Sequence, residues 1–356
     1  MRAGLPRRDS CSGRAPGLRG RRHHTRSRHP GTALTRVLGM IALVFASRLV
    51  VAAGQKVGPL QAANVTFRSA GVSLAGTVVL PAESGRRPAV VLLGGSGPAP
   101  REPLMVYARH FASLGLVALA FDKRGSGESQ GDWTDASLDD LAGDATAAMA
   151  FLAARPEVDP ARIGVWGVSQ AGWVVPLLAG RAQRPAFSIV VTGGGATPRE
   201  IEMFGYRSAL EAGQVPASDR AKAEALLVKY FSWLGSGAGR EALLAEVERV
   251  KDEPWFKFIR IDRTMPSDAS RPKWAWVATL DPAASIAQMR TPTLVVLGAG
   301  DPLGPADLSA ARWKQALEGS GNPDASVQVF EDMGHARQGQ GHNASNPIQP
   351  QLSQGD

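Results

Sequence analysis

Residues 163–172 read Ile163-Gly164-Val165-Trp166-Gly167-Val168-Ser169-Gln170-Ala171-Gly172. An apolar run ends in a serine that has a small residue two positions away on each side, Gly167 and Ala171. The pattern is typical of a sharp strand-to-helix turn, where the strained backbone around the serine leaves room for small side chains only. It predicts that Ser169 projects from the end of a buried strand, where a nucleophile would be exposed.

Short apolar runs and longer helical patterns alternate along the chain around this turn. The apolar runs cover residues 64–68, 72–80, 89–93, 116–121, 162–166, 187–191, 293–297 and 326–330. The helical patterns cover residues 103–114, 137–154, 171–179 and 305–317. Such alternation is typical of a mostly parallel sheet with helices on both faces, and the first two runs are expected to pair antiparallel. The sequence therefore predicts an α/β fold.

The spacing of apolar residues along the chain changes between residues 198 and 275. This stretch has no convincing buried strand and carries helical patterns at 221–233 and 241–250, so we expect a helical cap inserted between two core segments, 54–197 and 276–335. Gly193-Gly194-Gly195 is expected to be the exit from the core into the cap. No Gly-Lys-Ser/Thr ending follows these glycines, which argues against a phosphate cradle.

The positive charge of the chain is concentrated at its beginning. The net charge is +8, but residues 1–36 contain ten Arg and one Asp, so the remaining residues carry a net charge of −1. Nucleic-acid binding requires a basic surface on the folded part of a protein. The nearly neutral remainder therefore predicts no nucleic-acid partner.

An apolar segment follows the basic lead at residues 37–53 and ends in small residues. This order predicts a signal peptide within residues 1–53, cleavage near Ala53 and export of the protein. An uncleaved membrane anchor, the absence of export and a translation start near Met40 remain alternatives, and contact with a membrane is expected only through such an uncleaved segment. The single cysteine, Cys11, precedes the apolar segment, so the mature chain is expected to lack disulfides.

A serine hydroxyl needs an oriented base before it can attack a carbonyl carbon. Two histidines follow Ser169: His335 comes just after the predicted strand 326–330, whereas His342 lies in a polar tail. Asp301 follows the predicted strand 293–297 through three small residues. We expect the three to meet at one edge of the sheet, with Ser169 as nucleophile, His335 as base and Asp301 as acid.

The developing oxyanion of such a reaction needs two N–H donors. Gln170 begins the predicted helix after Ser169, so its backbone N–H would be one donor. The loop Gly94-Gly95-Ser96-Gly97-Pro98 follows the predicted strand 89–93, and its small residues allow close approach to the reaction centre. Gly95 and Ser96 are the candidates for the second donor.

Five segments together resemble the α/β-hydrolase superfamily, in particular exported esterases and serine aminopeptidase-like hydrolases with a helical cap. The segments are Leu93-Gly94-Gly95-Ser96-Gly97-Pro98, Phe121-Asp122-Lys123-Arg124-Gly125-Ser126-Gly127-Glu128-Ser129, Gly167-Val168-Ser169-Gln170-Ala171-Gly172, Leu297-Gly298-Ala299-Gly300-Asp301 and Gly334-His335. The resemblance covers residues 62–335 and implies the α/β-hydrolase fold. It also implies that the segment 122–129 ties loops together and has a structural role.

Two features of the sequence depart from that family pattern. Gly94 stands where relatives often have a histidine before the oxyanion loop. Relatives also place a helix after the catalytic histidine, whereas residues 336–356 are rich in Gln, Gly, Asn and Pro and are expected to form a flexible tail.

The expected function is a carboxylesterase acting on small or medium esters, without a cofactor or a metal. Hydrolysis of amides or peptides is one alternative, and a non-catalytic binding protein on a hydrolase fold is another. Aromatic residues of the predicted cap would either roof an apolar pocket or pack the cap onto the core. They are Phe231, Trp233, Trp255, Phe256, Phe258, Trp274 and Trp276.

Overall fold

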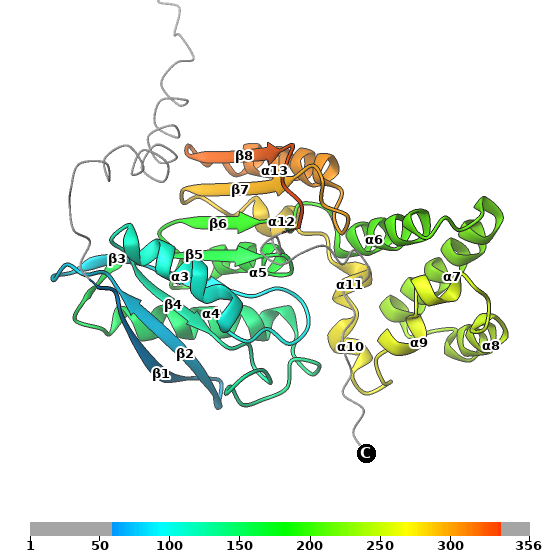
Figure 1. The fold of residues 1–356 in the computed structure, drawn as a ribbon, viewed down its shortest axis with the longest axis horizontal. Helices are drawn as coiled ribbons and strands as arrows, with labels where there is room; N and C mark the ends of the chain where they lie inside the picture. The colour runs from blue at the N-terminus through cyan, green and yellow to red at the C-terminus, as the bar shows by residue number, and fades with distance from the viewer. Residues whose placement is uncertain (1–58, 336–356) are drawn as a thin grey trace, which may run out of the picture.

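The computed structural model describes residues 59–335, which form one sheet covered by helices and a helical cap beyond one edge of the sheet (Figure 1). The predicted basic lead and signal peptide, residues 1–53, and the predicted tail, residues 336–356, lie outside the described residues. The strands are β1 (Gln61–Ser69), β2 (Val72–Leu80), β3 (Arg87–Leu93), β4 (Val117–Phe121), β5 (Val158–Val168), β6 (Ser188–Val191), β7 (Thr293–Gly298) and β8 (Ala325–Phe330).

The strand order in the sheet is β1-β2-β4-β3-β5-β6-β7-β8. The pairs β1–β2 and β2–β4 are antiparallel, and every later pair is parallel. The predicted mostly parallel sheet with a leading antiparallel pair is therefore confirmed. Because β3 and β5 to β8 run in the same direction, the loops after them meet at one edge of the sheet.

Side chains of the central strand β3 alternate between two apolar layers, as a period of two requires. Val90 and Leu92 pack with Phe111 of α3 (Met105–Ser113) on one face. Val91 packs with Met149 of α4 (Leu138–Ala153) on the other. The helices α5 (Ala171–Leu177), α12 (Ala283–Ile286) and α13 (Ala306–Ser320) complete the core.

Besides one turn of 3-10 helix at Phe256–Phe258, the cap contains six α-helices and has an apolar core of its own. They are α6 (Pro198–Ala212), α7 (Ala217–Ser236), α8 (Arg240–Val250), α9 (Ile261–Thr264), α10 (Arg271–Trp274) and α11 (Trp276–Thr279). Trp233, Trp255 and Phe256 are almost fully buried inside this core. These three residues therefore pack the cap itself, which is neither of the two alternatives that the sequence left open, a pocket roof or packing of the cap onto the core.

The boundary between cap and core differs from the predicted one. Helix α11 packs on α6 and α7, so the cap extends to Thr279, four residues beyond the expected end at residue 275. The difference arises because Trp276 contacts both the cap and the core. Its ring stacks on that of Trp274 in the cap, and it also packs against the apolar core around the sheet. Within residues 59–335, no helix has the length and apolar character needed to cross a membrane.

Candidate active site

Ser169 occupies the turn between β5 and α5 with a left-handed backbone φ of 57°. Non-glycine residues adopt this conformation at a cost and persist in it only where the surroundings impose it. Here the Ser169 amide donates to the carbonyl of Val191 at 2.9 Å, and a Cβ on Gly193 would lie 2.0 Å from the Ser169 carbonyl oxygen. The close backbone approach at Gly193 therefore helps to hold the predicted strand-to-helix turn.

The small residues around Ser169 are required by packing, as the sequence pattern predicted. A Cβ on Gly167 would lie 2.7 Å from the Cβ of Ala171, and a Cβ on Gly172 would lie 2.4 Å from the backbone of Gly193. Both distances are too short for real side chains. The turn can therefore form only because these positions carry little or no side chain.

Asp301 and His335 lie beside each other at the same edge of the sheet. The imidazole Nδ1 of His335 is 2.8 Å from Oδ2 of Asp301, and the other carboxylate oxygen accepts the amide of Leu303 at 2.8 Å. Asp301 is buried and His335 is partly exposed. The carboxylate is thus held from both sides and can fix the orientation of the imidazole ring.

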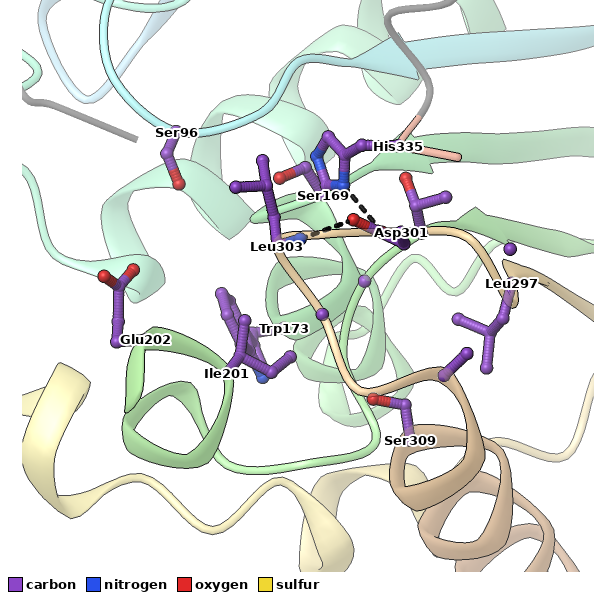
Figure 2. Close-up of a pocket in the computed structure, with 15 residues that line it drawn as sticks. Ser96, Ser169, Trp173, Ile201, Glu202, Leu297, Asp301, Leu303, Ser309 and His335 are labelled. Carbon is purple, nitrogen blue, oxygen red and sulfur yellow. Dashed lines mark hydrogen bonds and ion pairs between the residues drawn. The ribbon is translucent and has the colours of Figure 1, made fainter. Parts of the chain in front are cut away.

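A cavity of about 470 Å³, including the part open to solvent, is lined by Ser169, Asp301 and His335. In Figure 2 the imidazole of His335 lies between the side chains of Ser169 and Asp301. The structure therefore brings together all three residues that the sequence analysis selected. The hydroxyl of Ser169 and the hydrogen-bonded pair of His335 and Asp301 therefore line one cavity.

The predicted oxyanion loop passes directly beside Ser169. A Cβ on Gly95 would lie 3.1 Å from the Cβ of Ser169, and Ser96 lines the cavity. Gln170, the third candidate, precedes helix α5 and is buried. Gly95 and Gln170 thus lie next to Ser169, and Ser96 lines the same cavity.

The buried side chain of Lys123 joins the two sides of this candidate oxyanion site. Its ammonium donates to the carbonyl of Gly95, to the carbonyl of Gly97 at 3.1 Å and to the side-chain oxygen of Gln170 at 2.9 Å. Burial lowers the pKa of Lys123 to about 7. The sequence analysis missed this residue, although it lies inside a segment that the resemblance had marked.

The rest of the segment 122–129 ties loops and helices together. The fully buried carboxylate of Asp122 accepts the backbone amide of Arg101 at 2.7 Å and that of Glu128 at 2.9 Å. Arg124 forms a bidentate pair with Asp144 of α4 at 2.7 and 2.8 Å. These contacts agree with the structural role that was expected for Asp122 and Arg124.

A second cavity of about 660 Å³, including the part open to solvent, lies between the cap and the core. It shares Ser96, Trp173 and Glu202 with the first cavity, so the two adjoin. Burial raises the pKa of the Glu202 carboxyl to about 7, although the side chain keeps some exposure to the cavity. Sequence reasoning missed Glu202 as well. We call this second cavity the cap chamber.

No group of three or more His, Cys, Asp or Glu side chains suited to a metal ion occurs within residues 59–335. The described residues that line the first cavity offer a hydroxyl, an imidazole and carboxylates.

Comparisons with known proteins agree with this geometry. A model of the X-Pro dipeptidyl-peptidase (S15) family matches residues 70–310, more than half of the chain. The uncharacterized protein PA2218 of Pseudomonas aeruginosa is 38% identical over 114 residues, which make up 31% of this chain and 30% of that protein. The chain thus spans less than a third of the length of this relative.

Solved structures are similar to this chain in fold. The α/β-hydrolase GrgF from Penicillium has a TM-score of 0.50 at 18% identity, over 78% of this chain and 92% of that one. The esterase Pf2001 of Pyrococcus furiosus has a TM-score of 0.51 at 18% identity, over 78% of this chain and 84% of that one. Similarity at this level of identity concerns the fold alone.

Proposed function

Since this chain belongs to the X-Pro dipeptidyl-peptidase (S15) family and is an α/β-hydrolase enzyme, we propose that it is a serine carboxylesterase that cleaves small or medium esters. The observation that carries the proposal is the cavity lined by Ser169, Asp301 and His335, in which His335 Nδ1 lies 2.8 Å from Asp301 Oδ2. The name of the esterase Pf2001, whose fold is similar, is consistent with this reaction.

In the proposed first half-reaction, Ser169 Oγ attacks the ester carbonyl carbon and His335 Nε2 accepts the hydroxyl proton. Asp301 accepts the hydrogen bond from Nδ1–H, which fixes the tautomer of the ring and stabilises the imidazolium. The carbonyl oxygen becomes negatively charged, and the backbone N–H groups of Gln170 and of Gly95 or Ser96 would stabilise it. Each such donor typically contributes about 3 kcal/mol to the transition state.

Collapse of the tetrahedral intermediate breaks the bond to the alcohol, and the imidazolium of His335 donates its proton to the leaving oxygen. In the second half-reaction, His335 accepts a proton from water as the water attacks the acyl-enzyme. The acid product leaves and Ser169 regains its proton. The reaction needs no group beyond these side chains, the two amides and water.

Hydrolysis of amides or peptides is the second candidate, because the matching family is described as X-Pro dipeptidyl-peptidases. The same residues could perform it, with an amine in place of the alcohol as leaving group. Parallel kcat/KM measurements on p-nitrophenyl esters and on p-nitroanilides with the same acyl groups would separate the two candidates. We expect the esters to be cleaved and the anilides to be poor substrates by comparison.

The test of the main proposal uses the full chain, its Ser169→Ala variant and a series of p-nitrophenyl esters from short to long acyl groups. We expect turnover that depends on Ser169, and labelling of the parent but not of the variant by a fluorophosphonate probe. If Ser169→Ala is labelled as strongly as the parent, Ser169 is not the nucleophile. If the parent cleaves no ester of the series, the esterase assignment is wrong.

We also propose that the protein is exported, on the basis of the basic lead and apolar segment in residues 1–53. Sequencing the amino terminus of the protein in the secreted or periplasmic fraction tests this. A mature chain beginning near Gly54 is expected. An intact Met1 on protein confined to the cytoplasm would contradict it.

A further inference from the structure

Lys123 carries a buried positive charge that has hydrogen bonds but no negative partner. Its ammonium uses its three N–H groups on neutral acceptors, namely the carbonyls of Gly95 and Gly97 and the side-chain oxygen of Gln170. Within the described part of the chain, no carboxylate forms an ion pair with this ammonium. A buried charge without a counter-charge is unfavourable, so the resting protein lacks a group that would stabilise it here.

The carboxylates that the segment 122–129 carries or binds are engaged elsewhere. Each forms an ion pair with an arginine: Asp122 and Glu128 with Arg101 at 2.5 Å, and Asp144 with Arg124 at 2.7 Å. These pairs leave the ammonium of Lys123 as the positive charge of this region without a negative partner among the described residues. A negative charge that appears during the reaction would therefore be its counter-charge.

The peptide group between Gly95 and Ser96 presents its carbonyl oxygen to Lys123. In a trans peptide, the carbonyl and the N–H of the next residue point in opposite directions, so the N–H of Ser96 points away from Lys123. Ser96 lines the cavity that also contains Ser169, and Lys123 is not among the described lining residues. The hydrogen bond to Lys123 thus favours Ser96 over Gly95 as the second donor to the oxyanion.

The charge of Lys123 can act on both candidate donors through the groups that it binds. An ammonium bound to a carbonyl oxygen polarises that peptide group, and this strengthens its N–H as a donor. Lys123 binds the Gly95 carbonyl on one side and the Gln170 side chain on the other, so it also fixes these two residues relative to each other. In a buried site with low dielectric, the effect of such a charge is larger than in water.

We propose that the oxyanion of the tetrahedral intermediate is the missing counter-charge of Lys123. Lys123 does not touch the substrate in this proposal. It is a positioning residue that orients and polarises the peptide N–H of Ser96 and holds Gln170 in place. The inference rests on the proposed function, because an oxyanion forms only if Ser169 attacks a carbonyl carbon.

The sharpest test is Gln170→Glu, which supplies a counter-charge and keeps the hydrogen bond. A glutamate is ionised at pH 6, accepts the same N–H of Lys123 and leaves the backbone N–H at position 170 in place. We expect kcat on p-nitrophenyl butyrate at pH 6 to fall about tenfold while KM stays within about twofold, because the oxyanion loses the charge but keeps its donors. The Tm should not fall, since a buried ammonium gains a partner.

Gln315→Glu is the matched control, since Gln315 is exposed on α13 and should keep the parental kcat. Lys123→Met is the second variant, because it removes the charge and the hydrogen bonds together. If Gln170→Glu folds poorly, Lys123→Met still tests the proposal through the binding and pH measurements below.

An inhibitor that carries the negative charge of the intermediate separates an effect on the oxyanion from an effect on packing. Propylboronic acid has the shape of the butyryl group; Ser169 Oγ bonds to its boron, which becomes a tetrahedral anion, and His335 takes the hydroxyl proton. We expect it to bind about tenfold more weakly to Lys123→Met and to Gln170→Glu than to the parent. Inhibition by the neutral butyramide should change less than about twofold.

Titration of Lys123 offers a further readout. Burial lowers its pKa to about 7, so the ammonium is present at pH 6 and is lost as the pH rises through 7. The ratio of kcat, parent over Lys123→Met, should therefore be largest at pH 6 and fall severalfold by pH 8. The loop 94–98 and α5 contain no titratable side chain, and the acidic groups of the segment 122–129 keep their arginine partners. His335 acts on both proteins alike.

Three results would overturn the proposal. The first is a parental kcat and a parental boronate affinity in Gln170→Glu. The second is an equal loss of boronate and butyramide binding in Lys123→Met, which would show a structural role. The third is a kcat ratio that stays constant between pH 6 and pH 8.

Failure of this inference can be distinguished from failure of the esterase assignment. If esters are cleaved through Ser169 but Lys123→Met and Gln170→Glu match the parent, the esterase stands and the role of Lys123 is wrong. If the parent cleaves no ester, the esterase assignment fails and propylboronic acid alone decides. Binding to the parent that weakens in both variants would then support the role of Lys123, and equal or absent binding would overturn it.

Discussion

The two walls of the active-site region are built in different ways. The sheet-edge wall consists of the loops at residues 94–98, 169–172, 193–195 and 298–304, together with His335, and its parts are fixed by backbone contacts. A Cβ on Gly193 would lie 2.0 Å from the carbonyl oxygen of Ser169, and one on Gly298 would lie 2.1 Å from that of Met333. The cap wall consists instead of side chains on helices, namely Glu202, Tyr206, Tyr230, Phe231, Trp274 and Trp276.

Because of this difference, we expect the sheet-edge wall to determine the reaction and the cap wall to determine which substrate is preferred. Backbone atoms that touch one another leave little freedom, so the sheet-edge wall can hold a nucleophile and its partners in one geometry. Side chains on helices can be exchanged without moving the backbone, so the cap wall can be adapted to a ligand. Substitutions on the first wall should therefore abolish turnover, whereas those on the second should change which substrate is preferred.

The largest effect is expected from Asp301→Asn. The amide can donate to His335 Nδ1 and so stabilise the tautomer that cannot accept the proton of Ser169. We expect kcat on p-nitrophenyl butyrate to fall by about 10⁴, as loss of the acid does in the serine triad. Asp307→Asn, at an exposed position in the first turn of α13, is the control and should keep the parental kcat. A kcat within tenfold of the parent for Asp301→Asn would remove Asp301 from the triad.

The second prediction compares a glycine-to-alanine substitution on each of the two walls. Gly193→Ala places a methyl group against the Ser169 carbonyl, so we expect a loss of about 1–3 kcal/mol in the free energy of unfolding and a lower kcat. Gly205→Ala lies inside α6, where a Cβ would have its nearest neighbour at 3.8 Å. Because alanine favours a helix by up to about 1 kcal/mol over glycine, that variant should be as stable as the parent or more so. Urea unfolding of both variants measures this, and equal losses would contradict the contrast between the walls.

A smaller effect is expected from Lys123→Met, which keeps an unbranched side chain one atom shorter and removes the three hydrogen bonds to Gly95, Gly97 and Gln170. If Lys123 positions the oxyanion donors, kcat on p-nitrophenyl butyrate should fall about tenfold while KM stays within about twofold, since the donors act mainly in the transition state. Lys314→Met, at an exposed position of α13, is the control. A change confined to KM would contradict a positioning role.

The sheet-edge wall was predicted from the sequence because each of its residues follows a strand directly. Ser169, Asp301 and His335 come after apolar runs that must be buried in a parallel sheet, and parallel strands bring their ends to one edge. Lys123 escaped the prediction although it also follows a strand. Its partners lie 26, 28 and 47 positions away and two of them are backbone carbonyls, which carry no signal in the sequence.

The cap wall could not be predicted in the same way. The spacing of Thr197 and Glu200 is typical of a capping box, which Glu200 completes. No such local pattern marks Glu202, two residues later, as a residue that faces the cavities. Likewise Trp133, in a core loop, joins the chamber, whereas Trp233, in the cap, is buried away from it. The orientation of helices on one another decides these roles, and it depends on contacts between residues far apart in the chain.

The smallest effect concerns stability at the cap wall. Burial raises the pKa of Glu202 from the ordinary 4.5 to about 7. Between these values the folded chain holds a proton that the unfolded chain releases, so the free energy of unfolding falls as the pH rises through this interval and stays reduced above it. Glu202→Gln has no carboxyl group to titrate at this position, so the variant lacks this fall in the free energy of unfolding. We expect the Tm of the variant to match the parent at pH 5 and to exceed it by about 2–6 °C at pH 8.

Glu211→Gln is the matched control, since Glu211 is exposed on the same helix and this variant should give the same Tm difference from the parent at both pH values. A Tm of Glu202→Gln below the parental one at pH 8 would mean that the carboxylate has a stabilising partner in the folded protein. A gain in stability at pH 8 would instead show that the cap wall keeps an unfavourable buried charge.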